Sequence, residues 1–259
     1  MSNFAPAAEA TTQIVTFLAE CEQEIGISEI SRGTAINKNM VFRILNTLEN
    51  EGWVYCNEQK YSLTLLLFGL ASKPISRLSL NTAATPILYD LLNKTGESTY
   101  LGILKEDKVL YIQHLDGVKG VRVAGRVGGE YDLYRSAPGK VLLSYADDGF
   151  IEEYTSRNFE KTTQNTITEK TAMLSEIENI RKNGYAIDKE EFGNGITCAA
   201  APIYDYSGKV LAAIGCSAFT SNGKCEEIID ELLPQVLAAA KEISTRLGWA
   251  NNPTMEMEL

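Results

Sequence analysis

The amino-acid sequence predicts an α+β fold of two domains, and three observations support this prediction. The chain has 259 residues, which is more than one ordinary mixed domain contains, and its 44% hydrophobic and 22% charged content is typical of soluble globular proteins. Apolar residues recur at helical spacing in the first part of the chain. In the second part, pairs of strand-like segments joined by turn residues alternate with helical segments, which is typical of antiparallel sheets covered by helices.

Two helices are predicted in the first part of the chain. The first covers Glu9 to Glu22, where the apolar side chains form a single stripe. Gly26 ends this region, and Ser28 is suited to cap a short second helix from Glu29 to Gly33. The tight turn that follows contains Ala35, although glycine adopts the positive φ of many such turns more freely.

A third helix is predicted from Lys38 to Asn50, with Asn37 as its N-cap. Its apolar residues have the spacing i, i+3, i+4, i+7, so one face packs against the preceding helices and the opposite face is polar. A short helix, a tight turn and a longer helix with a polar outer face form a helix-turn-helix.

A β-hairpin is predicted directly after the third helix. Gly52 ends that helix, and two strands follow, from Trp53 to Cys56 and from Lys60 to Leu63. A polar turn, Asn57 to Gln59, joins them. The sequence therefore predicts a winged helix-turn-helix domain over residues 1–62.

The polar face of the third helix predicts contacts with double-stranded DNA. The N-terminal turn of such a helix fits the major groove, where asparagine pairs with adenine and arginine with guanine. A lysine on the wing is better placed to touch phosphate, and a methionine on the helix either meets a thymine methyl group or simply packs. The predicted DNA-binding residues are Lys38, Asn39, Met40, Arg43, Asn46 and Lys60. The alternative is a three-helix bundle with a hairpin that contacts protein.

The distribution of charge indicates modest DNA affinity. The net charge is −10, and residues 1–72 contain four basic and eight acidic side chains (4 − 8 = −4). The stretch from Ile30 to Leu48, however, has Arg32, Lys38 and Arg43 and no acid. A small cationic surface gives weak, salt-dependent binding, so we expect two or more copies to bind together.

A linker helix is predicted over residues 63–80. The run from Leu63 to Leu70 is apolar on nearly every face, and such a helix cannot be left in water. We favour packing against the same helix of a second subunit, which gives a homodimer. The alternative is a linker helix that is buried within one chain.

The second predicted domain covers residues 81–249, and residues 250–259 are expected to form a flexible acidic tail. Helices and paired strands alternate in this domain. The helices are predicted over Ala84–Lys94, Thr168–Lys182 and Cys225–Leu247, and the strands over Ser98–Leu104, Val109–Leu115, Thr197–Tyr204 and Val210–Phe219.

The sequence resembles the IclR family of bacterial transcription regulators along almost the whole chain. The run from Ile27 to Val54 resembles the family's DNA-binding half. Residues 181–205 look like the family signature, although Ala199 stands where a branched aliphatic residue is usual. The segment from Ser136 to Lys140 resembles the loop and helix start whose backbone N–H groups hold an effector in relatives. The resemblance implies that the second domain is GAF-like and binds a small-molecule effector.

The resemblance also implies the residues of the effector site. Gly215 stands where some relatives have a second serine, so a roomier cavity is expected and a glyoxylate-like ligand is disfavoured. Pro138 lacks an N–H, which weakens an anion site. Apart from the resemblance, Tyr100, Leu101 and Tyr134 could line a more apolar cavity, and core packing is the alternative use of such residues. The expected effector-binding residues are Tyr100, Ser136, Ala137, Pro138, Asp188, Cys198 and Ser217.

Asp188 indicates the chemistry of the effector. A carboxylate suits a ligand with hydroxyl groups, and the alternative is that Asp188 forms a cap or salt bridge on a solvated turn. The expected effector is therefore a small organic acid or a hydroxylated metabolite.

Enzyme activity, a cofactor and a metal site are not expected. An acyl-transfer enzyme would need Cys198, His114 and Asp188, but this single histidine lies in an alternating strand, and one histidine makes no His-rich metal site. The glycines match no nucleotide-binding motif. The scattered cysteines, and the absence of both a signal peptide and a membrane span, predict a cytoplasmic protein.

The function expected from these patterns and the resemblance is sequence-specific regulation of transcription, by repression in our interpretation. The protein would act on a palindromic operator as a homodimer or a dimer of dimers, and a tetramer is implied by the resemblance alone. Binding of the effector would shift the balance between two dimer arrangements and so change the affinity for DNA.

Overall fold

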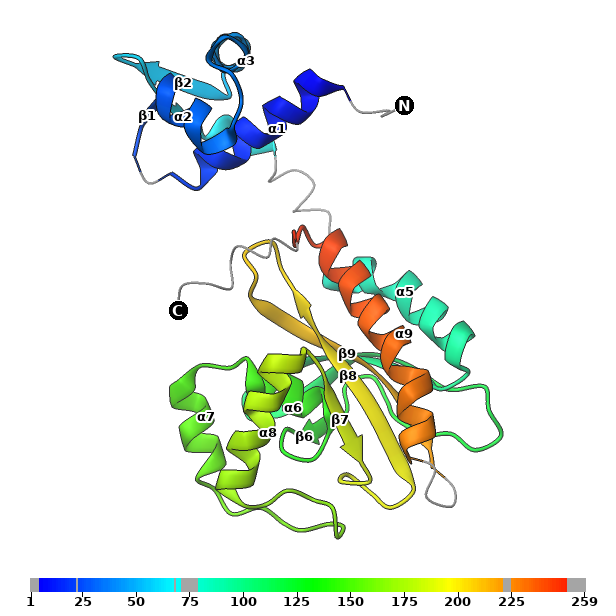
Figure 1. Ribbon diagram of the computed structural model, residues 1–259. Helices are drawn as coiled ribbons and strands as arrows, with labels where there is room; N and C mark the ends of the chain where they lie inside the picture. The colour runs from blue at the N-terminus through cyan, green and yellow to red at the C-terminus, as the bar shows by residue number, and fades with distance from the viewer. Residues whose placement is uncertain (1–4, 22, 68, 71–78, 221–224, 251–259) are drawn as a thin grey trace. The chain divides into compact units, whose positions relative to one another are not determined.

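The chain forms two compact units, residues Met1–Leu78 and Ser79–Leu259. The computed structural model describes residues 5–21, 23–67, 69–70, 79–220 and 225–250 (Figure 1). Helices and antiparallel sheets occur in both units, which confirms the predicted α+β fold class.

The N-terminal unit combines a helical bundle with a small antiparallel sheet. The sheet has three strands in the order β1-β3-β2, and β2 and β3 form the predicted wing hairpin. The elements are α1 (Pro6–Ala19), β1 (Ile25–Gly26), α2 (Ile27–Thr34), α3 (Lys38–Asn50), β2 (Val54–Asn57) and β3 (Lys60–Leu63).

Helix α3 has the bounds that its sequence predicts. The Asn37 side chain accepts a hydrogen bond from the Met40 backbone N–H at 3.0 Å, which satisfies one of the free donors of the first turn. The apolar face is buried at the predicted spacing and packs on α1 and α2. Its four buried residues are Val41, Ile44, Leu45 and Leu48.

Two helix starts differ from the prediction. Helix α1 begins at Pro6 rather than Glu9, because proline is well suited to the first helical position. Helix α2 begins at Ile27, so its N-cap is Gly26 and not Ser28. The Glu29 carboxylate accepts a hydrogen bond from the Gly26 N–H at 2.9 Å and stabilises this earlier start.

The turn between α2 and α3 depends on Ala35, which has φ 57° and ψ 17°. A residue with a Cβ pays about 1–2 kcal/mol for this left-handed conformation. Side chains of α2 help to hold the turn: the Ser31 hydroxyl donates to the Ile36 carbonyl at 2.6 Å, and the Thr34 hydroxyl donates to the Ile30 carbonyl at 2.7 Å.

The C-terminal unit contains an antiparallel sheet of six strands in the order β6-β5-β4-β9-β8-β7. Its strands are β4 (Ser98–Lys105), β5 (Lys108–Leu115), β6 (Glu130–Asp132), β7 (Ala186–Lys189), β8 (Ile196–Tyr204) and β9 (Val210–Phe219). Its helices are α5 (Leu80–Thr95), α6 (Ala137–Ser144), α7 (Asp148–Thr155), α8 (Lys170–Asn183) and α9 (Cys225–Arg246).

Helices cover both faces of this sheet, as Figure 1 shows. Helices α5 and α9 lie side by side on one face, and α6, α7 and α8 gather on the other. Successive side chains of β8 point to opposite faces of the sheet. Cys198 therefore packs in the core on the α6 side, and Ala199 packs in the core on the α9 side. A strand that is buried on both faces is apolar throughout, which explains why β8 shows no polar alternation.

Several elements were not predicted. All eight residues of α6 are buried, so the helix has no polar face to reveal its period.

The predicted linker helix and acidic tail lie largely outside the described residues: Leu63 ends β3, positions 66–67 and 69–70 are helical, and 71–78 and 251–259 are not described. Among the described residues, no helix is long and apolar enough to cross a membrane.

Candidate functional site

The exposed face of α3 carries the predicted DNA-binding side chains. Asn39, Arg43 and Asn46 have the spacing i, i+4, i+7 on the side opposite the buried stripe. Lys38 and Arg43 are exposed, while Asn46 is half-buried. The first turn of α3 contains no acidic residue. The helix therefore offers amide and cationic groups to a partner.

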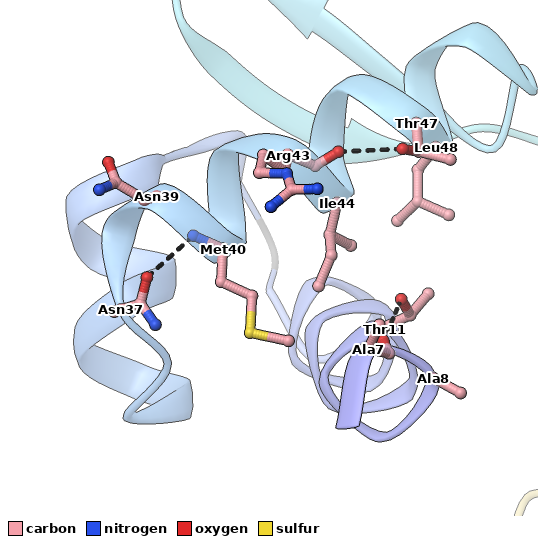
Figure 2. Close-up of a pocket in the computed structure, with 10 residues that line it drawn as sticks. All are labelled: Ala7, Ala8, Thr11, Asn37, Asn39, Met40, Arg43, Ile44, Thr47 and Leu48. Atoms are coloured by element: carbon pink, nitrogen blue, oxygen red, sulfur yellow. Dashed lines mark hydrogen bonds between the residues drawn. The ribbon is translucent and has the colours of Figure 1, made fainter. Parts of the chain in front are cut away.

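A groove of about 600 Å³ separates α3 from α1 next to this face. Figure 2 shows Met40 and Ile44 reaching from α3 toward α1. Met40 packs against the apolar core and is half-buried, so its packing role is present alongside its place in the groove. The groove is lined by Ala7, Ala8, Thr11, Asn37, Asn39, Met40, Arg43, Ile44, Thr47 and Leu48.

Lys60 lies on the wing and not in this groove. It pairs with Asn57 at the end of the hairpin, where Glu58 and Gln59 have positive φ values of 47° and 62°. Two positive φ angles in sequence are typical of the tight turn that matches the twist of a hairpin. Lys60 is exposed at this tip, as a phosphate contact requires.

The four basic side chains that the structure describes in the N-terminal unit are free of ion pairs with other described residues. Within residues 5–67, none of Arg32, Lys38, Arg43 and Lys60 forms an ion pair with a described residue. A cation without a partner in its own chain keeps its full charge for an external anion.

Sequence reasoning missed two exposed aromatic residues in this unit. Phe42 on α3 is 49% exposed, and Tyr55 on β2 is 57% exposed. Phe42 was not predicted, because the outer face of α3 was expected to be polar. Its position, four residues before Asn46 on the helix, is the signal that would have found it.

All seven predicted effector-binding residues line one cavity in the C-terminal unit. The cavity measures about 40 Å³, and every strand of the six-stranded sheet contributes to its wall, together with the start of α6. The residues are Tyr100, Tyr111, His114, Val123, Ala124, Gly125, Tyr131, Ser136, Ala137, Pro138, Asp188, Phe192, Ile196, Cys198 and Ser217. Their role in effector binding stays a prediction.

Asp188 is fully buried in the cavity wall. Its Oδ1 accepts hydrogen bonds from the backbone N–H groups of Glu191 at 2.6 Å and Phe192 at 3.3 Å, so it caps a turn, but a buried one. Its Oδ2 is buried and has no hydrogen-bond partner in the described part of the chain. Burial raises the pKa of this carboxyl to about 6. One acceptor oxygen is therefore available to a ligand.

The buried side chain of Lys140 on α6 stabilises the part of the cavity wall that contains Asp188. Its buried Nζ donates to Glu191 Oε1 at 2.6 Å, to Glu176 Oε1 at 2.9 Å and to the Ile187 carbonyl at 2.6 Å. Burial raises the pKa of Glu191 to about 7, whereas the charge of Lys140 opposes that rise. This ammonium ties α6, α8 and the end of β7 together. Sequence reasoning considered only backbone groups in the segment that contains Lys140.

Cys198 and Ser217 face each other on neighbouring strands, with Sγ and Oγ 3.0 Å apart. Burial raises the pKa of the Cys198 thiol well above its usual range, so the thiol stays protonated. His114 also lines the cavity, but no hydrogen bond joins it to Cys198 among the described residues. A protonated thiol without a base is not a nucleophile.

A β-bulge brings His114 into the cavity. Tyr100 pairs with His114, but Gly102 pairs with Tyr111, so one extra residue interrupts the alternation of β5. Tyr111 and His114 therefore share a face although they are three residues apart. Burial lowers the pKa of His114, which makes its imidazole neutral near pH 7. Strict alternation, used on the sequence, cannot find this pair.

Three expectations about the cavity are wrong. Leu101 faces the α5 and α9 side of the sheet, and Tyr134 packs on Phe159 and donates to the Glu160 carbonyl at 2.9 Å, so neither lines the cavity. The cavity is also not roomier at Gly215, because the ring of Tyr100 fills that space.

Comparisons with known proteins agree with this arrangement. The family model "IclR helix-turn-helix domain" matches residues 7–57, and the model "Bacterial transcriptional regulator IclR C-terminal" matches residues 72–245. The chain is 34% identical to the HTH-type transcriptional regulator KdgR of Escherichia coli over 90% of this chain and 89% of that protein. It is 29% identical to the E. coli DNA-binding transcriptional repressor YiaJ over 91% of this chain and 86% of that protein.

A solved structure extends the likeness to three dimensions. The IclR protein of Thermotoga maritima is 28% identical, with a TM-score of 0.57 over 93% of this chain and 98% of that one. These matches confirm the resemblance seen in the sequence, and relatives that are named as regulators confirm the expectation of a regulator rather than an enzyme. The chain is a transcriptional regulator of the IclR family, with an N-terminal helix-turn-helix domain and a C-terminal effector-binding domain.

Proposed function

We propose that this regulator is a cytoplasmic homodimer, or a dimer of dimers, that binds a two-fold symmetric operator through α3. A small hydroxylated metabolite or organic acid in the C-terminal cavity then changes its affinity for DNA. The observation that carries this proposal is the exposed, unpaired set of cationic and amide side chains on α3.

The chemistry of α3 supports readout in the major groove. Arg43 and Asn39 are the residue types that pair bidentately with guanine and adenine, and both are exposed at the same side of the helix. Lys38 at the helix start and Lys60 on the wing are placed to contact phosphate. Base contacts then give specificity, and the lysines give register on the duplex.

Low local charge supports binding by more than one copy. The N-terminal unit has few cations, and the whole chain carries a net charge of −10, which repels DNA. Leu65 and Leu66 are 86% and 45% exposed, although they are apolar. A second subunit that covers this apolar surface would also bring a second α3 to the operator, and two linked contacts raise the total affinity.

The cavity supports control of DNA binding by an effector that donates a hydrogen bond. The unpartnered Oδ2 of Asp188 accepts but cannot donate when the carboxyl is ionised, so a ligand hydroxyl is its natural partner. The effector binds one of two dimer arrangements more tightly and so shifts the equilibrium toward it. The two arrangements differ in the spacing of the two α3 helices. Repression is the sense of regulation that we propose, by likeness to YiaJ.

The test is selection of DNA sequences by the purified full-length protein at fixed salt. We expect an enriched motif with two-fold symmetry and half-sites about one helical turn apart. The variant Asp188→Ala should retain operator binding and lose the response to a metabolite mixture. Enrichment of no symmetric motif would refute the operator proposal, and an unaltered metabolite response would remove Asp188 from the site.

A further inference from the structure

The ring of Tyr100 lies against Gly215 of the neighbouring strand β9. Tyr100 on β4 pairs with Gly215 on β9. A Cβ atom on Gly215 would lie 2.4 Å from Cε2 of Tyr100 and 2.6 Å from its Cζ and Oη. No real Cβ makes such contacts, so the ring occupies space that exists only because position 215 has no side chain.

The hydroxyl of Tyr100 has no hydrogen-bond partner in the part of the chain that the structure describes, although the side chain is only 1% exposed. A buried hydroxyl without a partner costs about 1–3 kcal/mol. Such a group in a native protein calls for an explanation. The same cavity is lined by the polar side chains of Asp188 and Ser217, but neither forms a hydrogen bond of ordinary geometry with this hydroxyl.

The remaining space is too small for a metabolite. A cavity of about 40 Å³ holds a few water molecules at most. Sites for small molecules usually measure about 300–1,000 Å³. Polar groups such as Asp188 and Ser217 line the cavity, and the ring of Tyr100 occupies the space above Gly215 at its wall.

We propose that the Tyr100 side chain is an internal plug that occupies the effector's own place above Gly215, so that an effector binds by displacing the ring. This inference rests on the proposed effector-sensing function and names the residue that sets affinity and size selectivity. The ligand is a hydroxylated compound that donates to Asp188 and lies against the bare backbone of β9 at Gly215.

An effector that displaces the ring must break a stacking contact, and an irregular segment of the cavity wall gives the ring space to move. The plugged state stacks Tyr100 on Tyr111, with ring centroids 4.8 Å apart and planes 8° from parallel, and the effector must overcome this contact. The affinity for the effector is reduced by the population of the plugged state. Residues 123–125 line the cavity and belong to no helix or strand, so this part of the wall can give way.

The first test is the variant Gly215→Ala, which pushes the ring out of its place. Burial holds the pKa of Tyr100 well above its usual range, so the displaced phenol should newly titrate near pH 10, about the ordinary value. We expect absorbance titration to count one more tyrosine than in the unchanged protein. The double variant Tyr100→Phe/Gly215→Ala should lose that extra tyrosine. Failure to fold, or no additional tyrosine, would show that the ring is ordinary core packing.

The second test is the variant Tyr100→Ala, with D-glycerate, glycerol and p-cresol as probes in calorimetry. We expect a gain of about tenfold or more in affinity for D-glycerate or glycerol, because the plug no longer competes. The matched variant Tyr154→Ala removes a buried tyrosine that does not line the cavity, so it should gain affinity for p-cresol at most. If Tyr100→Ala gains affinity for p-cresol alone, or for none of the probes, the proposal is wrong. Neither test contains DNA, so its failure is separate from failure of the regulator proposal.

Discussion

The two units hold their polar side chains in opposite ways. Among the described residues of the N-terminal unit, the basic side chains are exposed and form no ion pairs. In the C-terminal unit, Lys140 is buried and has three partners, and Asp188 is fixed by two backbone donors. A surface for a large anionic polymer needs free charge, whereas a closed cavity for a small molecule needs groups held rigidly in place.

This difference separates function from stability in one unit and joins them in the other. Exposed side chains contribute little to the free energy of unfolding, so substitutions on α3 should change binding alone. Buried charges are costly unless they are paired, so substitutions behind the cavity should change stability first.

The largest effect is expected for Lys140→Met. Removing this cation leaves Glu191 and Glu176 without their buried partner, and we expect a loss of about 3–5 kcal/mol in the free energy of unfolding. Urea unfolding measures it. The matched variant Lys94→Met breaks an exposed pair with Asp90, and because water screens that pair it should lower the stability far less. Equal losses in the two variants would contradict the contrast between buried and exposed charge.

Asp188→Asn should change how stability depends on pH. The folded carboxyl has a pKa of about 6 against an ordinary 3.8, so the folded state holds its proton longer than the unfolded state. Stability from this group is therefore complete below about pH 4 and is lost as pH rises to about 6, by an amount on the order of 3 kcal/mol. Asparagine does not titrate.

We therefore expect Asp188→Asn to gain stability relative to the unchanged protein as pH rises from about 4 to 7. Urea midpoints at several pH values within that range provide the measurement. A difference between the two proteins that stays constant with pH would show that the carboxyl does not titrate in this window.

Arg43→Ala should weaken operator binding by about 1–3 kcal/mol and leave the unfolding midpoint unchanged. Arg43 is exposed and forms no ion pair with a described residue, so its removal breaks no ion pair within the described part of the chain. Fluorescence anisotropy with the selected operator measures the affinity. Arg246→Ala, which removes an exposed arginine of α9, is the control and should bind normally. A fall in stability without a fall in affinity would reverse the assignment of α3.

The smallest effect is expected for Ala35→Gly. Glycine adopts the observed φ of 57° without a Cβ penalty but loses more backbone entropy, so the gain in stability should be about 0.5–1 kcal/mol. DNA affinity should stay the same. Thermal unfolding and anisotropy test both expectations, and a destabilised variant would mean that the Ala35 side chain makes contacts that outweigh the strain.

The sequence predicted α3 correctly because its cap and its period are local properties. Asn37 and the i, i+3, i+4, i+7 stripe specify the helix without reference to the rest of the chain. Periodicity did not find helix α6, because all its residues are buried and no polar face remains, and only its start was implied by the family resemblance. Six of the seven cavity residues were named by family resemblance and Tyr100 as an aromatic residue suited to an apolar cavity, since strands that are distant in sequence form the wall.

Other parts of the site depend on contacts that no local pattern contains. The bulge that turns His114 into the cavity is a property of the pairing between β4 and β5. The contact of Tyr100 with Gly215 joins strands more than a hundred residues apart, so the missing side chain was interpreted as extra room when it is in fact space for a ring.

Photo-cross-linking from the exposed face of α3 tests the central claim most directly. A photoreactive amino acid in place of Asn39 should cross-link the selected operator at two symmetric positions about one helical turn apart. The same group in place of Tyr89, an exposed residue of α5, should not cross-link. DNA cross-links from position 89 and none from position 39 would contradict the account.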